Sequence, residues 1–283
     1  MEIVEKAPAK LNLLLNVLFK RTDGFHELEL IMTAVDLSDR LTFTPQKDSA
    51  IKLVSNSAAI PLNKKNIVYQ AARLLKEKHQ IDEGVQIRIN KQIPVAAGLG
   101  GGSSDAAAAL RGLNRLWQLN LSLEELAELG ETLGSDVPFC IYNKTAYATG
   151  RGEAIQLIEE IPQCWVVLVK PVKGISSWTV FEKLEPEVLP KYPAQQMVEA
   201  IAAKDYEKMV QQMGNALEPI SIEQQPDIQI IKEKMKAFGA DTAVMSGTGP
   251  TVYGFTQHFS KAQRIVNGLK GFCKEVYLVR TLK

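Results

Sequence analysis

The first fifty residues alternate between apolar and polar positions, as half-buried β-strands do. Residues 9–18 place alanine, leucine and valine side chains on one face and polar side chains on the other. This pattern predicts a strand that carries Lys10 and Asn12 side by side on its polar face. Apolar stretches at residues 28–37 and 41–44 predict two further strands.

Helical spacing follows over residues 63–79, and alternation returns over residues 85–90. These patterns predict a helix and then a strand. A loop at residues 93–102 comes after the strand. Residues 103–105, with the sequence Ser-Ser-Asp, have the side chains that cap helices, so they are expected to start a helix over the alanine-rich residues 106–117.

The second half of the chain mixes helices and strands without strict alternation. Its predicted elements are a helix opened by a capping box of Ser122 and Glu125, a strand at 165–169, helices at 194–203, 206–216 and 226–238, a hairpin-like segment at 243–255, a helix after Ser260 and a strand at 275–280. Residues 171–193 show little regular pattern apart from one turn of helix near Val180. This order predicts an α+β fold.

Composition limits the class of protein. The 283 residues are about twice the length of one typical domain, so we expect two domains, at residues 1–157 and 158–283. A hydrophobic content of 46% and a charged content of 23% exclude a disordered chain. The net charge of +1 gives no field that would attract nucleic acid or an anionic membrane.

Three cysteines, Cys140, Cys164 and Cys273, lack the CxxC spacing of a thiolate zinc site and do not form a disulfide framework. A reducing compartment is expected, and the cytoplasm fits it. The first residues lack the basic region of a signal peptide, and no apolar run reaches the roughly 20 residues of a membrane span. We therefore expect a cytoplasmic protein without a membrane or nucleic-acid partner.

A glycine-rich segment at residues 93–105 is the most informative motif. Its glycines let backbone N–H groups approach an anion closely, and the helix that follows directs its positive end to the same place. A phosphate group is the expected ligand, with a flexible turn as the alternative. The loop is not a Walker loop, because no Gly-Lys-Ser/Thr closes it, and Ser103 replaces the third glycine of a dinucleotide fingerprint.

A second glycine cluster, residues 245–251 with the sequence Met-Ser-Gly-Thr-Gly-Pro-Thr, lies far away in the sequence. Two such loops are able to enclose one anionic ligand. A tight hairpin explains the cluster equally well. Both interpretations stay open at this point.

Five segments in order along the chain carry a resemblance: Pro-Ala-Lys-Leu-Asn at 8–12, Arg-Thr-Asp-Gly-Phe-His at 21–26, the glycine loop at 94–104, Gly-Ser-Asp-Val-Pro-Phe at 134–139 and the second glycine cluster at 245–251. They resemble the motifs of the GHMP small-molecule kinases. The first two segments are similar to the branch that acts on 4-diphosphocytidyl-2-C-methyl-D-erythritol. This resemblance implies a two-domain α+β fold with a cleft between the domains.

The resemblance also implies an activity, transfer of the ATP γ-phosphate to the 2-hydroxyl group of that acceptor in non-mevalonate isoprenoid synthesis. Asp136 matches the catalytic aspartate of the family and Lys10 its catalytic lysine. From the residues alone, Asp136 is equally a helix N-cap ahead of Pro138, and Lys10 a lysine on a solvated strand face.

Further residues match the ATP site of the family. Asn66 and Lys91 match positions near the adenine, although a polar residue near a helix and an exposed strand lysine are the alternatives. ATP and Mg²⁺ are the implied cofactors, with Ser104 as a candidate for the otherwise unknown metal ligands. The glycine-loop positions that match are Pro94, Val95, Ala96, Ala97, Gly98, Leu99, Gly100, Gly101, Gly102, Ser103 and Ser104.

The acceptor site of the family matches Asn12 and the pair Phe25 and His26, which hold the pyrimidine by ring stacking and hydrogen bonding. Many members have tyrosine where this chain has Phe25. Phe181 is the candidate for the opposite side of the pyrimidine ring, and Trp178 lies too close in sequence to be separated from it.

The expected partner is therefore a small molecule, the cytidylylated methylerythritol, bound by a monomer or weak homodimer. Two alternatives differ from this prediction. One is a GHMP kinase with another acceptor, such as homoserine, mevalonate or a sugar. The other is a non-catalytic ligand-binding relative.

Overall fold

A computed structural model describes residues 2–282, and their packing forms two compact units. The first unit contains the chain up to Ala9 together with Leu37–Val95 and Gly100–Asn143. The second contains Lys10–Asp36, Ala96–Leu99 and the chain from Lys144 onward. Neither unit is a continuous stretch of sequence. The predicted division at residues 157 and 158 stays a prediction, and it differs from these interleaved units.

The first unit contains one sheet, in the strand order β3-β4-β2-β1. Its strands are β3 (Ile51–Ser55), β4 (Gly84–Asn90) and the portions that this unit takes from β1 (Ile3–Lys20) and β2 (His26–Gln46). Strand β4 runs antiparallel to β2, with Phe43 opposite Ile87, and parallel to β3. Both Phe43 and Ile87 are fully buried, so one face of this sheet belongs to the core.

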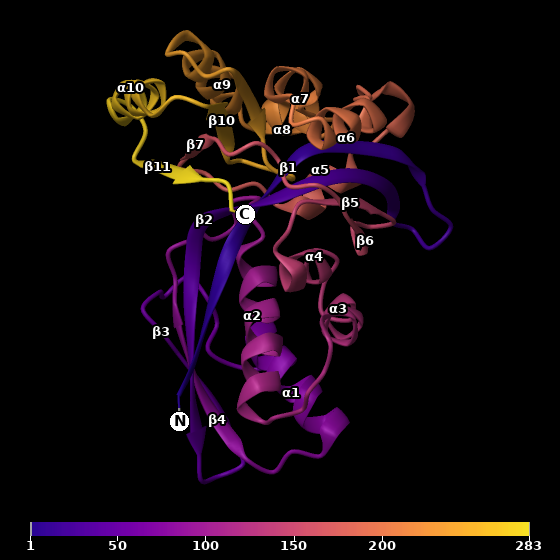
Figure 1. The fold of residues 1–283 in the computed structure, drawn as a ribbon, viewed down its shortest axis with the longest axis vertical. Helices are drawn as coiled ribbons and strands as arrows, with labels where there is room; N and C mark the ends of the chain where they lie inside the picture. Colours follow the sequence, from indigo (N-terminus) through magenta and orange to yellow (C-terminus); the bar gives the residue numbers. More distant parts are fainter. Residues whose placement is uncertain (1, 283) are drawn as a thin grey trace. The chain divides into compact units, whose positions relative to one another are not determined.

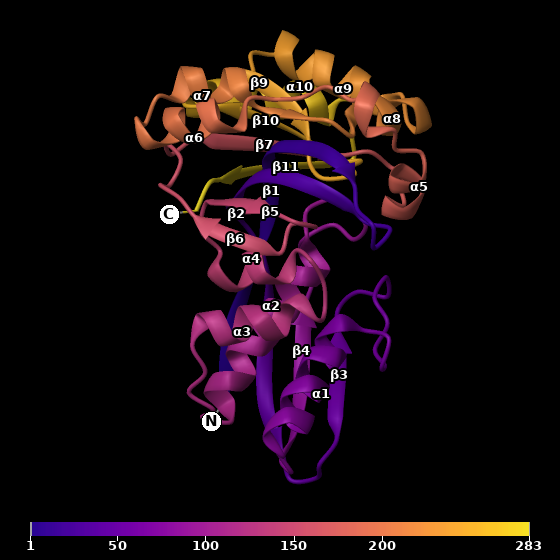
Figure 2. The same ribbon diagram turned by 90° about the vertical axis from the view of Figure 1, so that its right-hand side faces the viewer.

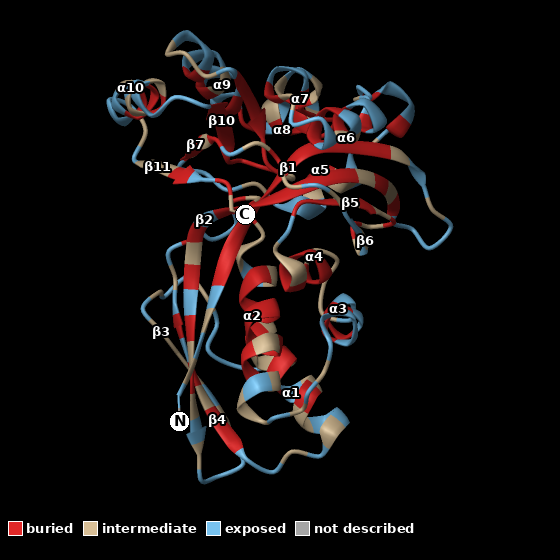
Figure 3. Ribbon diagram, in the orientation of Figure 1, coloured by how far each residue is buried: buried red, intermediate tan, exposed pale blue. Residues whose placement is uncertain are grey.

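Four helices belong to the first unit: α1 (Ile67–His79), α2 (Gly101–Leu116), α3 (Leu123–Glu131) and α4 (Val137–Tyr142). Figure 1 shows α1 and α2 on one side of the sheet. Gly112 lets α2 pack closely against β2, because a Cβ at that position would lie 2.3 Å from the ring of Phe43. Most of α2 is buried, as the red surface of its ribbon in Figure 3 shows.

Helix α2 starts earlier than the sequence predicts. The sequence predicts that residues 103–105 cap a helix at 106–117, but they lie inside α2. The N-cap is Gly100, which has the left-handed φ of 65° that glycine adopts without strain. Because the Ser104 N–H is the first to bond within the helix, to the Gly100 carbonyl, the N–H groups without an intrahelical partner are those of Gly100, Gly101, Gly102 and Ser103.

The second unit contains an antiparallel sheet in the order β11-β7-β10-β9. Its strands are β7 (Trp165–Lys170), β9 (Thr242–Met245), β10 (Val252–Thr256) and β11 (Glu275–Arg280). The predicted hairpin at 243–255 is confirmed, since β9 and β10 pair with Met245 opposite Val252.

Three other strands of this unit pair with β1, with β2 or with each other. Strand β8 (Gly214–Asn215) pairs in parallel with β1, and β5 (Ala146–Thr149) pairs with β2 and with β6 (Ala154–Leu157). Sheets that are mostly antiparallel, with helices in between, confirm the α+β prediction.

The helices of the second unit are α5 (Ser177–Glu182), the 3₁₀ helix η1 (Pro186–Val188), α6 (Ala194–Ala202), α7 (Tyr206–Gln212), α8 (Glu218–Gln224), α9 (Asp227–Ala237) and α10 (Phe259–Lys270). Figure 2 shows α7, α9 and α10 over one side of the antiparallel sheet, with strand β1 on its other side. Among residues 2–282, no helix combines the length and the apolar sequence that crossing a membrane requires.

Two further predictions about elements need correction. The predicted helix at 206–216 ends at Gln212, because Met213 is extended and leads into the short strand β8. The predicted strands at 28–37 and 41–44 are one strand, β2. The polar interruption between them includes Asp39, which is fully buried and paired with Lys91, so it does not end the strand.

Candidate active site

Lys10 and Asn12 form a buried pair in the second unit. The Lys10 ammonium donates a hydrogen bond of 2.7 Å to Asn12 Oδ1, and the two residues are 5% and 1% exposed. Tyr253, in β10, donates from its hydroxyl to the Asn12 carbonyl at 2.7 Å. The predicted proximity of Lys10 and Asn12 is thus confirmed, and the interpretation of Lys10 as a solvated lysine is wrong.

The two glycine segments meet in the same unit. Ser246 Oγ donates to the Gly98 carbonyl at 2.9 Å, and a Cβ added at Gly98 would lie 2.2 Å from the Ser246 carbonyl oxygen. Gly98 also has a φ of +73°. A Cβ at Gly247 would lie 3.5 Å from Asn12 Oδ1, so the Lys10–Asn12 pair lies against the second glycine cluster. This cluster is therefore both a hairpin turn and a neighbour of the first loop.

Residues that the sequence analysis did not identify support the second glycine cluster. Asn215 Nδ2 donates to the carbonyls of Met245 at 2.8 Å and Gly247 at 2.7 Å. Glu218, at the start of α8, accepts from the Met245 N–H at 2.7 Å. A lone Asn or Glu gives no signal of such a role in the sequence, because β8 and α8 reach these positions only in the folded chain.

An aromatic pair lies at the start of β2. The rings of His26 and Phe181 stack with their centroids 5.9 Å apart and their planes at 29°. Trp178 is 73% exposed, so the structure places Phe181 and not Trp178 beside His26. Phe25 is 54% exposed, with the Arg151 guanidinium 5.2 Å from its ring centroid.

His26 is buried, and its Nε2 atom has no hydrogen-bond partner among the described residues. Burial, aided by the charge of Lys20, lowers the pKa of His26 below its usual 6.5. The neutral ring therefore presents an unsatisfied nitrogen. Such an atom is costly to bury unless a ligand completes its hydrogen bonding.

The lowered pKa of His26 predicts a pH dependence of stability. Below about pH 6.5 the unfolded chain takes up a proton at this position more readily than the folded chain, so the free energy of unfolding falls as the pH decreases. Above that range the contribution disappears. Urea unfolding at about pH 5.5 and about pH 7.5 should give a smaller difference for His26→Gln than for the unsubstituted protein. Equal differences would contradict this assignment.

The start of α2 belongs to the first unit. Ser104 is fully buried there, and its hydroxyl has no hydrogen-bond partner among residues 2–282. The described residues include no cluster of three or more His, Cys, Asp or Glu side chains that would hold a metal ion. A hydroxyl without a partner beside a helix N-terminus fits the oxygen chemistry of Mg²⁺ with phosphate.

Asp136 occupies the N-cap position of α4, but its side chain makes no capping hydrogen bond. The other end of this short helix is held by Arg111 of α2, whose Nη1 donates to the carbonyls of Cys140 at 2.6 Å and Ile141 at 3.3 Å. Arg111 Nη2 also donates to the Lys6 carbonyl of β1 at 3.0 Å. These bonds fix α4, and with it the position of Asp136, on a framework of α2 and β1.

Asn66 caps α1, as its Oδ1 accepts from the Val68 N–H at 2.9 Å. Its amide also donates to the Pro61 carbonyl at 2.6 Å. The interpretation as a residue that belongs to a helix end is therefore supported. Its proximity to adenine stays a prediction.

Lys91 is not the exposed strand lysine of the alternative interpretation, since its side chain is only 6% exposed. It forms ion pairs with Asp39 and, at 2.8 Å, with Asp105. Burial alone lowers the pKa of Lys91, but the two carboxylates outweigh this effect and raise it. Burial, together with the charge of Asp39, raises the pKa of Asp105, and the Lys91 ammonium opposes this shift.

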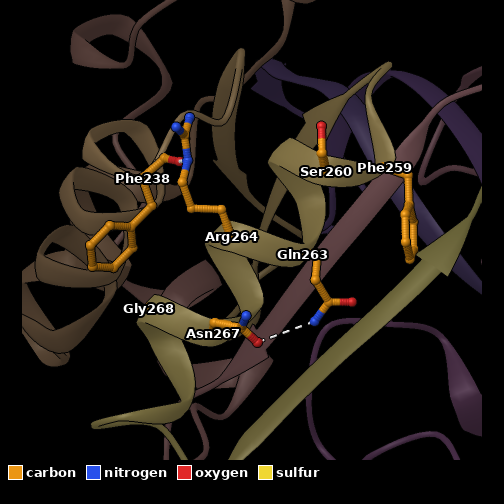
Figure 4. A pocket seen from close by; sticks show the side chains of 7 residues that line it. All are labelled: Phe238, Phe259, Ser260, Gln263, Arg264, Asn267 and Gly268. Carbon is orange, nitrogen blue, oxygen red and sulfur yellow. Dashed lines mark hydrogen bonds between the residues drawn. The ribbon is translucent and has the colours of Figure 1, made fainter.

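A surface hollow in the second unit contains none of the predicted site residues (Figure 4). Its lining residues are Phe238, Phe259, Ser260, Gln263, Arg264, Asn267 and Gly268. Arg264 donates to the Phe238 carbonyl at 2.8 Å, and Gln263 donates to Asn267 at 3.1 Å. These polar groups are thus partly satisfied by one another, and the lining residues include no carboxylate, histidine or cysteine.

Two family models match this chain, one after the other along the sequence. The model of the GHMP kinases N terminal domain matches residues 66–144, and that of the GHMP kinases C terminal domain matches residues 197–275. The first match includes Asn66, the glycine loop and Asp136. The second includes the second glycine cluster.

Individual relatives are similar over their whole length. A 4-diphosphocytidyl-2-C-methyl-D-erythritol kinase of Bacillus velezensis is 54% identical over 282 residues, covering 100% of this chain and 98% of the relative. One of Enterococcus faecalis is 52% identical, with 100% of both chains covered. A crystal structure of 4-(cytidine 5'-diphospho)-2C-methyl-D-erythritol kinase superposes with a TM-score of 0.84 at 31% identity and full coverage of both chains.

A homoserine kinase structure from Cytophaga hutchinsonii also matches, with a TM-score of 0.77. It covers 98% of this chain and 94% of its own, but only 18% of the residues are identical. This second likeness concerns the fold alone.

Proposed function

Because the chain belongs to the GHMP kinases, and within them to the 4-diphosphocytidyl-2-C-methyl-D-erythritol kinases, we propose that it phosphorylates this acceptor at the 2-hydroxyl group with ATP. The product belongs to non-mevalonate isoprenoid synthesis. The observation that carries the proposal is the buried Lys10–Asn12 pair beside the two glycine segments, in a chain that matches these kinases from end to end.

Asp136 serves as the general base in this proposal. As the 2-hydroxyl oxygen forms its bond to the γ-phosphorus, the hydroxyl proton passes to the Asp136 carboxylate. The bond from the γ-phosphorus to the bridging oxygen breaks, and ADP leaves. Lys10 offsets negative charge on the transferring group, the electrostatic task that dominates phosphoryl transfer.

The phosphates of ATP are assigned to the glycine loop from Pro94 to Ser104. Backbone N–H groups and the positive end of α2 favour anions at this place. The unpartnered hydroxyl of Ser104 supports it as the side chain that would hold Mg²⁺, together with phosphate oxygens. When bound, Mg²⁺ supplies charge neutralisation at the phosphates. Asn66 and Lys91 complete the ATP side.

The acceptor is assigned to Asn12, Phe25, His26 and Phe181. The unsatisfied Nε2 of neutral His26 supports a hydrogen bond to the pyrimidine, and the aromatic rings beside it support stacking. Phe25 lacks the hydroxyl that a tyrosine would supply, so it contributes to acceptor binding only by stacking its ring face on the pyrimidine.

Phe25→Ala tests the stacking role. Loss of about 1–3 kcal/mol of stacking should raise KM for the acceptor roughly 5- to 150-fold. Steady-state kinetics should show an unchanged KM for ATP. Thermal unfolding should show an unchanged melting temperature, because the ring is 54% exposed and adds little to the core. Phe19 is also 54% exposed, and Phe19→Ala serves as the matched control. An unaltered acceptor KM in Phe25→Ala would remove Phe25 from the site.

The proposal includes a cytoplasmic location and a monomer or weak homodimer. It also assigns ATP binding to residues 1–157 and part of the acceptor side to residues 158–283. Sedimentation equilibrium measures the oligomeric state directly. Separate expression of the two halves would test the division.

Product analysis tests the proposed reaction. After incubation with MgATP and the cytidylylated acceptor, ³¹P NMR should show ADP and a new phosphomonoester coupled to the 2-position of the methylerythritol. A phosphomonoester at another hydroxyl would contradict the proposed regiochemistry. ADP without any phosphorylated acceptor would contradict the proposed transfer.

A further inference from the structure

Three buried charged side chains lie beneath the start of α2. Lys91 follows β4, Asp39 comes from β2 and Asp105 from α2, and their side chains are at most 6% exposed. The Lys91 ammonium contacts carboxylate oxygens of both acids. We call these three residues the charge triad. Its members come from three different elements, so the triad joins them.

The triad holds the first end of the glycine loop through Asp39. The Oδ1 atom of Asp39 accepts the backbone N–H groups of Gln92 at 2.5 Å and Ile93 at 2.8 Å. The Asn56 side chain bonds to both backbone groups of Lys91. Its Oδ1 accepts from the Lys91 N–H at 2.8 Å, and its Nδ2 donates to the Lys91 carbonyl at 3.3 Å. The chain that enters the loop is therefore bonded at three successive residues.

The triad also holds the second end of the loop. Asp105 lies in the early turns of α2, and its Oδ2 accepts from Lys91 at 2.8 Å. A Cβ at Gly101 would lie 3.4 Å from the Lys91 ammonium nitrogen and 3.0 Å from the Ile93 side chain. The ammonium group thus lies directly under the first helical residue, where the unpaired N–H groups begin.

The geometry points to a positioning role for Lys91: its ammonium group ties both ends of the glycine loop together and sets the N–H groups that receive the nucleotide phosphates. This inference rests on the proposed function, in that it takes the loop as the phosphate site. Lys91 then contributes to ATP affinity through the loop, and its ammonium group makes no bond to the adenine. Two carboxylates already occupy that group in a nearly inaccessible place.

The test separates the phosphates from the adenine. For Lys91→Met, the dissociation constants of ATP and ADP should rise at least tenfold, whereas the inhibition constant of adenosine, measured against ATP, should change less than twofold. Equal weakening of adenosine and ATP would overturn the inference in favour of direct contact with adenine. Unchanged binding of all three would reduce the triad to a structural ion pair.

A second variant keeps the test decisive if Lys91→Met does not fold. Asp39→Asn retains an oxygen for the Gln92 and Ile93 N–H groups but removes the charge that pairs with Lys91. It should show the same selective loss for ATP and ADP. Lys78 is exposed, and Lys78→Met is the matched control. If the unsubstituted protein binds no ATP, the proposed function is wrong. If the unsubstituted protein is an active kinase but the variants lose affinity for adenosine as much as for ATP, only this inference is wrong.

Discussion

Replacing Asp136 by Asn is expected to lower kcat roughly 10²- to 10⁴-fold while the dissociation constant of ATP stays within about twofold. The amide keeps the size of the carboxylate but does not accept the hydroxyl proton. The side chain makes no capping hydrogen bond in α4, so its replacement does not remove a helix cap. Single-turnover kinetics and isothermal titration with ATP measure the two quantities.

Asp82→Asn provides the control, because it makes the same chemical change at an exposed position of the first unit. It should leave kcat unchanged. If Asp136→Asn retained full turnover, Asp136 would not be the base. A parallel loss of ATP affinity and turnover would instead indicate damage to the fold around α4.

The second large effect is expected for Gly98→Ala, which should destabilise the protein by about 3 kcal/mol. The added Cβ would lie 2.2 Å from the Ser246 carbonyl oxygen, a distance that forces the two glycine segments apart. The left-handed φ of +73° adds backbone strain of about 1–2 kcal/mol for a residue with a Cβ. Urea denaturation measures the loss, and turnover should fall with it.

Gly24→Ala isolates the strain. Gly24 has a φ of +87°, but a Cβ there would meet nothing within 4 Å. Its destabilisation should be about 1–2 kcal/mol, without the steric part. Equal losses of stability in the two variants would show that the contact between Gly98 and Ser246 is not tight.

The sequence predicts local structure well where one periodicity continues without interruption. The strand with Lys10 and Asn12 and the hairpin at 243–255 follow from alternation and turn residues. The start of α2 does not, because a glycine N-cap needs no side chain and the serines nearby are stronger signals of a helix start.

The environment of individual site residues depends on partners that are distant in the sequence. Lys91 looks like an exposed lysine until Asp39, 52 residues earlier, and Asp105 enclose its ammonium group. Gly98 meets Ser246 across 148 residues, and Tyr253 meets the Asn12 carbonyl across 241. Periodicity contains no information about such pairs. The motifs nevertheless identify Lys10, Asn12 and the glycine segments, because their residue types match a known chemistry.

The choice of acceptor distinguishes this enzyme from the other GHMP kinases, and a panel of acceptors measures it. ADP release with MgATP should be followed for 4-diphosphocytidyl-2-C-methyl-D-erythritol, its uncytidylylated phosphate, mevalonate, homoserine and galactose. Turnover is expected with the cytidylylated compound alone, since the rings of His26 and Phe181 need a base to stack on and the other four acceptors have none. Turnover with another acceptor and none with this one would contradict this expectation.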